Sequence, residues 1–143
     1  MARLVGINHV ALEVGDLDEA LTLYARLFDF ELRGRRAHMA FIDLGDQFLA
    51  LDEGRTQPPD ERRHFGLVVD DKEAVREAVR REGLTLLDGP GLRFADPWGN
   101  AIEVVDYRDV QFERTSGVKR KLGITDLAKR EGARREIEEK GLG

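Results

Sequence analysis

The sequence predicts an α+β fold in which a β-α-β-β-β module occurs twice and a helical extension follows. Two alignments of the chain with itself support this prediction. The stretch "HVALEVGD" at 9–16 matches "HFGLVVDD" at 64–71, which places His9 over His64 and Asp16 over Asp71. The stretch "DLGDQFLAL" at 43–51 lies over "DPWGNAIEV" at 96–104 at a similar offset. A sequence repeat of this size indicates a duplicated structural unit.

The first module is expected over residues 4–52. Residues 4–14 alternate as a half-buried strand does, and apolar residues then recur at helical period over 17–28. Asp16 stands at the N-cap with Glu19 three residues on, which is the capping-box spacing. Three short strands are expected at 30–35, 38–44 and 47–52, with a turn at Gly45-Asp46 between the last two. The polar stretch 52–63 contains Pro58-Pro59 and is typical of a linker.

The second module is expected over residues 63–106 and repeats this order. A strand covers 63–69, and a helix over about 71–82 is ended by Gly83. Short strands follow near 84–87, 91–95 and 101–106, with the turn "DPWGN" before the last one. Residues 1–108 are therefore predicted to form one domain built from two modules.

Residues 109–143 belong to neither repeat and are predicted to form a helical extension. Thr125 is a candidate cap for a helix over about 126–140. The apolar face of that helix is thin, with Leu127, Ala128 and Ile137. It is either a solvated terminal helix, or the extension docks on a second subunit through Val110, Phe112 and Val118.

Composition excludes several classes of function. The chain has no cysteine, which rules out disulfides, thiolate metal sites and thiol nucleophiles. A net charge of −5 argues against general nucleic-acid binding. No apolar run approaches the roughly 20 residues that span a bilayer, so no membrane role is expected. We expect a cytoplasmic protein.

Three chemistry-bearing side chains share one predicted environment: His9, His64 and Glu103. Each lies on the strand face opposite the bulky residues that should pack against the helices. If the repeat brings the first strands of the two modules together, the three side chains converge. Two imidazoles and one carboxylate form an open site for a divalent metal. A lone histidine on a strand is usually only hydrogen-bonded, but two of the chain's three histidines occupy equivalent repeat positions.

The chain resembles the vicinal oxygen chelate superfamily, also called the glyoxalase/bleomycin resistance/dioxygenase superfamily. The resemblance covers about residues 4–107 and is carried by "INHVALEVGDLDEALTLYARLFDFEL", "HFGLVVDD" and "FADPWGNAIEVVDY". It implies paired modules that form a cup-shaped mixed sheet around one divalent metal ion, of which Fe, Mn, Zn and Ni are all candidates. It implies His9, His64 and Glu103 as the ligands, a small substrate that chelates through two adjacent oxygens, and a homodimer.

Two positions depart from the patterns of particular members. Glyoxalase I takes a fourth ligand from the last strand of the first module, and Ala50 stands at that position; Leu49, one residue earlier, is no ligand either. Fosfomycin-inactivating transferases commonly carry a threonine where this chain has Ala11. The first departure weakens glyoxalase-type proton transfer and favours dioxygenase-type or group-transfer and lyase chemistry.

Three functional hypotheses follow from the resemblance. The leading one is a metal-dependent enzyme of the dioxygenase, lyase or transferase type. The alternatives are a non-catalytic, antibiotic-sequestering protein of the bleomycin-resistance kind, and a domain whose metal serves only stability. The candidates for residues around the metal site are His38, Tyr107 and Arg93, with Trp98 and Arg108 as further possibilities.

Overall fold

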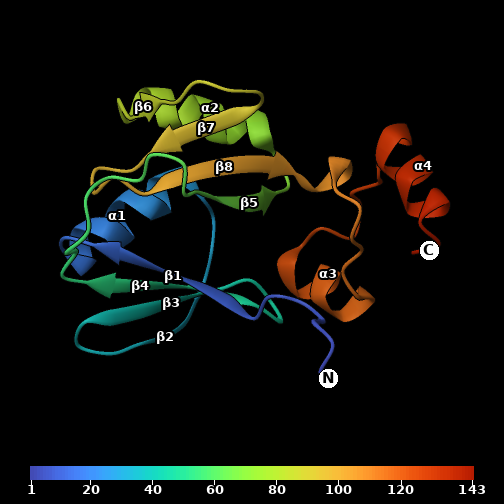
Figure 1. Cartoon of the computed structure of the whole chain (residues 1–143), viewed down its shortest axis with the longest axis horizontal. Helices are drawn as coiled ribbons and strands as arrows, with labels where there is room; N and C mark the ends of the chain where they lie inside the picture. The colour runs from blue at the N-terminus through green and yellow to red at the C-terminus, as the bar shows by residue number, and fades with distance from the viewer. The chain divides into compact units, whose positions relative to one another are not determined.

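Each half of the chain has its own mixed sheet. The computed structural model describes residues 1–143, which divide into two compact units, Met1–Pro58 and Pro59–Gly143. Each unit contains a β-α-β-β-β module with one helix and a four-stranded sheet, and in unit 2 further helices follow the module (Figure 1). The predicted α+β class and the duplicated module are therefore confirmed.

Unit 1 builds its sheet in the order β1-β4-β3-β2. The strand β1 runs parallel to β4, and the other neighbours are antiparallel. The elements are β1 (His9–Val14), α1 (Leu17–Leu27), β2 (Leu32–Arg35), β3 (Met39–Asp43) and β4 (Phe48–Glu53).

Unit 2 repeats this topology in the order β5-β8-β7-β6, with β5 parallel to β8. Its elements are β5 (Phe65–Val69), α2 (Lys72–Arg81), β6 (Thr85–Leu86), β7 (Leu92–Ala95) and β8 (Ala101–Asp106). The short helix η1 (Tyr107–Asp109) follows, and then α3 (Ser116–Leu122) and α4 (Glu131–Glu139).

The two module helices begin in the same way, as the repeat predicts. Asp16 accepts a hydrogen bond from the Glu19 amide at 2.9 Å, and Asp71 accepts one from the Ala74 amide at 3.0 Å. Each carboxylate satisfies an amide that the first helical turn leaves without a partner. The residue pair that aligned in the sequence is thus a pair of N-caps.

Alternate residues of a strand point to opposite faces of its sheet, a core face and an open face. Ile102 and Val104, two of the buried residues of β8, share the core face with Phe94 on β7 and lie beneath α2. Leu12, Val14 and Leu51 form the corresponding core in unit 1. The odd-numbered residues of β1 and β8, His9 and Glu103 among them, therefore occupy the opposite face.

The first strand is shorter than predicted. Residues 4–8 precede β1 and do not extend it, and Leu4, Val5 and Ile7 are largely exposed. The pairing partner β4 begins only at Phe48, whose amide donates to the Asn8 carbonyl. Earlier residues have no strand beside them to complete a ladder.

The predicted helix over about 126–140 is shorter in the structure, where α4 begins only at Glu131, and a further helix, α3, precedes it. Thr115, not Thr125, is an N-cap and accepts from the Val118 amide. Gly123 ends α3 in the left-handed conformation, at φ 71°. The Arg130 amide then donates to the Arg108 carbonyl, so the backbone just before α4 is bound to η1 instead of to a helical turn.

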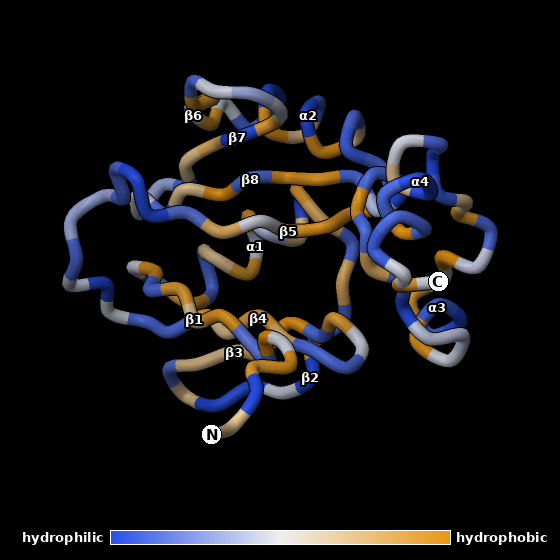
Figure 2. The backbone as a smooth tube through the Cα atoms, turned by 45° about the vertical axis from the view of Figure 1, so that its right-hand side comes forward, coloured by the Kyte–Doolittle hydropathy of each residue, from blue (hydrophilic) through white to orange (hydrophobic).

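The extension is polar along most of its length, as Figure 2 shows for α4, which is largely blue while β8 is largely orange. Ala133 and Ile137 are the buried residues of α4. None of the helices combines the length and the apolar character required to cross a bilayer.

Candidate metal centre

His64 is held with one ring nitrogen occupied and the other available. It immediately precedes β5, and its Nδ1 lies 2.9 Å from the Arg62 carbonyl oxygen. A carbonyl can only accept, so in the neutral ring the proton resides on Nδ1. Nε2 then carries the lone pair, which is the form in which histidine binds metals.

Glu103 lies opposite that nitrogen, in the middle of β8. Its Oε2 is 3.6 Å from His64 Nε2, and both side chains are partly exposed. A separation of 3.6 Å is too long for a good hydrogen bond. The imidazole nitrogen and the carboxylate oxygen are therefore close to each other without forming a good hydrogen bond.

The donor set suits a divalent ion. Metal–nitrogen and metal–oxygen bonds of about 2.1 Å place two neighbouring ligand atoms of one ion about 3.0–3.4 Å apart. The observed Nε2–Oε2 separation is slightly larger than this range. The Nδ1–H of His64 already donates a hydrogen bond to a carbonyl, as it does in metal-binding histidines. His64 and Glu103 thus fit two positions of a metal site.

His9 is prepared in the same manner in unit 1. It is the first residue of β1, and its Nδ1 lies 2.8 Å from Oδ1 of Asn8. Its ring stacks on Phe48, with centroids 4.6 Å apart and planes 6° from parallel. A donated Nδ1 proton again leaves Nε2 as the lone-pair nitrogen.

The three predicted ligands are divided between the units. His64 and Glu103 are neighbours within unit 2, while His9 belongs to unit 1. Neither unit alone gathers three histidine or acidic side chains around a point that could hold an ion. The full ligand set, His9, His64 and Glu103, therefore stays a prediction.

Ala50 shares the open face of unit 1 with His9. In the parallel pair His9 is opposite Phe48, and Ala11 is opposite Ala50. Leu49 is opposite Val10 and shares the core face with Leu51, which is opposite Leu12. Position 50 is thus the one on the open face, where a fourth metal ligand would lie, and its side chain is only a methyl group.

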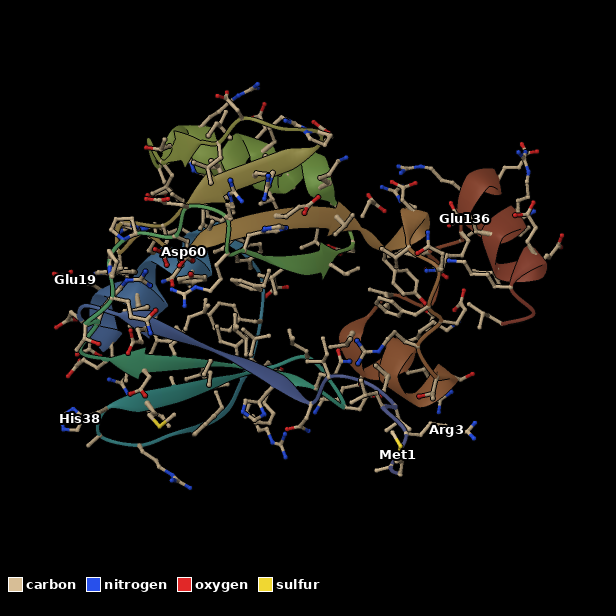
Figure 3. The ribbon with its side chains drawn as sticks, in the orientation of Figure 1. Met1, Arg3, Glu19, His38, Asp60 and Glu136 are labelled. Atoms are coloured by element: carbon tan, nitrogen blue, oxygen red, sulfur yellow. The ribbon has the colours of Figure 1, made fainter.

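The other candidate residues lie in different surroundings. His38 precedes β3, projects outward at the edge of unit 1 (Figure 3) and pairs with Glu53 at 3.1 Å. The pKa of Glu53 is lowered because the carboxylate accepts from the Leu17 amide and from His38. The Tyr107 hydroxyl donates to Glu113 and accepts from the Arg114 amide, and burial raises its pKa.

Asp106 closes β8 and holds the extension to it. It is 2% exposed and accepts two bonds from the Arg108 guanidinium, at 2.7 and 2.8 Å. These bonds lower the pKa of Asp106 to about 2. The Arg108 guanidinium is therefore occupied by its hydrogen bonds to Asp106. Trp98, another candidate, lies in the turn before β8.

Arg93 is the exception among these candidates, because it lies beside Glu103. The antiparallel pairing of β7 and β8 sets the two residues directly opposite each other. The sequence contained a signal for this: both residues are the same number of positions from the centre of the "DPWGN" turn. The roles of Asn8, Arg62 and Phe48 around the histidines had no comparable signal.

Comparison with known families supports the resemblance inferred from the motifs. The family model described as Glyoxalase/Bleomycin resistance protein/Dioxygenase superfamily matches residues 6–104. The chain belongs to this superfamily. The match covers most of both modules and includes all three predicted metal ligands.

Among curated proteins, a glutathione transferase FosA of Serratia marcescens is 29% identical over 113 residues, which cover 71% of this chain and 80% of that one. Among solved structures, the fosfomycin resistance protein FosX of Mesorhizobium loti is 21% identical with a TM-score of 0.60, over 71% of this chain and 92% of that one. The Listeria monocytogenes FosX, complexed with Mn(II) and sulfate, is 16% identical with a TM-score of 0.61, again over 71% and 92%. At these identities the two structures establish a shared fold.

Proposed function

We propose that this chain is a divalent-metal-dependent enzyme that acts on a small substrate through two adjacent oxygens. The observation that carries the proposal is the arrangement of His64 and Glu103. An imidazole with its Nδ1 proton already donated lies 3.6 Å from a carboxylate, on the open face of a sheet. His9 would add the third ligand, because its ring is prepared by Asn8 in the same way.

The metal, when bound, would supply Lewis-acid polarisation of the substrate oxygens. The protein's own contribution is to fix the ligands. The Arg62 carbonyl and the Asn8 amide oxygen each hold one imidazole in the tautomer that leaves Nε2 available. Phe48 restricts the His9 ring by stacking on it. Such supporting groups typically change metal affinity about 10- to 100-fold when they are removed.

Group transfer is the reaction class that we favour. The relatives named above are a glutathione transferase and fosfomycin resistance proteins, and one is complexed with Mn(II). Ala50 offers no carboxylate for proton abstraction of the glyoxalase I kind, which supports the same choice. Dioxygenase chemistry stays a prediction from the sequence. Ala11 departs from the transferase pattern, so fosfomycin is one test substrate among several.

Metal binding is the first test. Mn²⁺ titration followed by electron paramagnetic resonance should show one tight site in the parent protein. The variants His9→Ala and His64→Ala should each lose that site, since two remaining ligands hold an ion far less well than three. His38→Ala serves as the control, because His38 pairs with Glu53 away from the site. Unchanged Mn²⁺ affinity in His9→Ala or His64→Ala would rule the site out.

Catalysis is the second test. The Mn²⁺-loaded protein should consume fosfomycin or a related small epoxide in the presence of a thiol such as glutathione, monitored by ³¹P or ¹H magnetic resonance. Binding of such compounds without turnover would favour the alternative, a sequestering protein. A homodimer is also expected from the family resemblance, and sedimentation velocity would measure it.

A further inference from the structure

Arg93 is a half-buried cation without a partner. Its guanidinium takes part in no ion pair, hydrogen bond or ring contact. Two other partly buried arginines of unit 2 are paired: Arg76 bonds Glu73 at 3.1 Å, and Arg108 bonds Asp106 at 2.7 Å. Partial burial of an unpaired charge costs free energy that a bound anion would offset.

The position of Arg93 connects it to the candidate metal centre. A single row of partners crosses the sheet of unit 2 from Gly66 on β5 to Glu103 on β8 and Arg93 on β7. Partners in one row point to the same face, so Arg93 shares the open face with Glu103. Gly66, on the other side of Glu103, is exposed and has no side chain to fill that face.

Glu103 itself does not neutralise Arg93. Its carboxylate approaches His64, and no ion pair joins it to the arginine across the strands. The arginine instead lies along the loop that precedes β7: a β-carbon placed on Gly89 would come within 3.2 Å of Arg93 Nη1. The guanidinium therefore lies beside this loop, on the strand next to the carboxylate that we propose as a metal ligand, and makes no ion pair with it.

The duplicated module provides an internal comparison. Phe41 pairs with Ala50 in unit 1 as Arg93 pairs with Glu103 in unit 2. Phe41 is engaged, because its ring makes an edge contact with Phe48 at 5.7 Å. The same position therefore holds a packed aromatic ring in the unit without the carboxylate, and an unpaired cation in the unit with it.

We infer that Arg93 binds an anionic group of the substrate next to the atoms that chelate the metal. The substrate class is then a small molecule with a metal-chelating oxygen pair and a nearby oxyanion, either a carboxylate or a phosphonate. Guanidinium presents five N–H donors in a planar fork that matches both groups. This inference rests on the proposed function, since it assigns a second contact in that same site.

The test compares three bidentate metal ligands on the full-length, Mn²⁺-loaded protein by isothermal titration calorimetry. Acetohydroxamate has no additional anionic group, malonomonohydroxamate adds a carboxylate, and phosphonoacetohydroxamate adds a phosphonate. We expect at least one anionic ligand to bind about tenfold more tightly than acetohydroxamate, as a charge-assisted hydrogen-bonded pair provides. The tighter of the two identifies the oxyanion.

The variant Arg93→Gln should lose this preference while its affinities for Mn²⁺ and for acetohydroxamate stay unchanged. Arg80→Gln removes the same charge from an exposed position on α2 and should retain the preference. If Arg93 served only to balance Glu103, Arg93→Gln would tighten Mn²⁺ binding and leave the preference intact, which would overturn the inference. Equal binding of all three ligands to the parent would overturn it as well, with the metal site still standing. Failure of Mn²⁺ or of every hydroxamate to bind would instead remove the proposed function and the inference together.

Discussion

Ala50 and Glu103 occupy the same register position in the two units. Ala50 is the β4 partner of Ala11, and Glu103 is the β8 partner of Gly66, which the sequence repeat places over Ala11. The duplicated sheet thus offers two equivalent sites for a ligand on the open face. Only one of them carries a carboxylate, so unit 1 has no acidic side chain at the position that matches Glu103.

Restoring that carboxylate should change the metal site. The variant Ala50→Glu is expected to hold Mn²⁺ more tightly and acetohydroxamate more weakly, because the new side chain occupies one position that the chelator needs. Calorimetric titration of both ligands measures the two effects. Ala50 is 2% exposed, so the larger side chain carries a packing cost. Ala50→Gln carries nearly the same cost without the charge and should leave Mn²⁺ affinity close to that of the parent. Equal chelator affinity in Ala50→Glu and the parent would mean that position 50 does not face the metal.

Asp106 should make stability depend on pH at the acidic end. Its pKa is lowered to about 2 by the Arg108 guanidinium, from an ordinary value of 3.8. A lowered folded-state pKa adds stability that is present above about pH 4 and lost as the pH falls toward 2, and the shift corresponds to about 2 kcal/mol. Urea unfolding of Asp106→Asn should therefore show a deficit of this size at pH 7 that shrinks below pH 4. Asp126→Asn, at an exposed position, should show neither effect. A deficit that is constant between pH 7 and pH 2.5 would contradict this account.

Lys129 should secure the extension to the end of β8. Its ammonium donates to the Tyr107 carbonyl at 2.6 Å and lies 3.6 Å from the centre of the Tyr107 ring. Burial lowers the pKa of this amine, so desolvation offsets part of the gain. Lys129→Met keeps a long apolar stem and removes the charged ammonium. We expect the free energy of unfolding to fall by about 1 kcal/mol. Limited proteolysis with trypsin should then cut the extension faster, whereas Lys140→Met at the exposed end of α4 should not change the rate. Unaltered cleavage in Lys129→Met would show that other contacts hold the extension.

Gly99 should tolerate no side chain. It has φ +88°, and a β-carbon there would lie 2.6 Å from the Cα of Pro59. Gly99→Ala therefore combines backbone strain with a backbone clash, and we expect a loss of about 2–3 kcal/mol in urea unfolding. Gly91→Ala separates backbone strain from the clash, since Gly91 has φ +79° with open space around it. This variant should lower the free energy of unfolding by about 1 kcal/mol. Similar losses in the two variants would mean that the contact with Pro59 is not rigid.

Local patterns predicted the elements and the faces because they depend on neighbouring residues. The alternation of "HVALEV" assigns His9 to the face opposite Leu12 and Val14, and the structure buries those two residues as expected. The spacing from Asp16 to Glu19 predicted the cap of α1, which is confirmed. The same reasoning did not predict where the last helix of the extension begins. Its helical period continues through 126–130, but the Arg108 carbonyl captures the Arg130 amide, and this contact is between residues 22 positions apart.

The sequence by itself determined the duplicated module, the class of each element, and the chemistry of the open faces, because periodicity and turn residues act over a few positions. It could name His64, Glu103 and Arg93 as candidates, and the DPWGN turn indicated that Arg93 and Glu103 are cross-strand neighbours. Only the tertiary structure decided that His64 Nε2 lies 3.6 Å from Glu103 Oε2 and that the Arg93 guanidinium makes no ion pair with that carboxylate. Strand pairing joins residues distant in the chain, and its register is set by the sum of many backbone hydrogen bonds and packed side chains across the sheet. For that reason the contacts between the candidate residues can be read from the folded molecule but not from the amino-acid sequence.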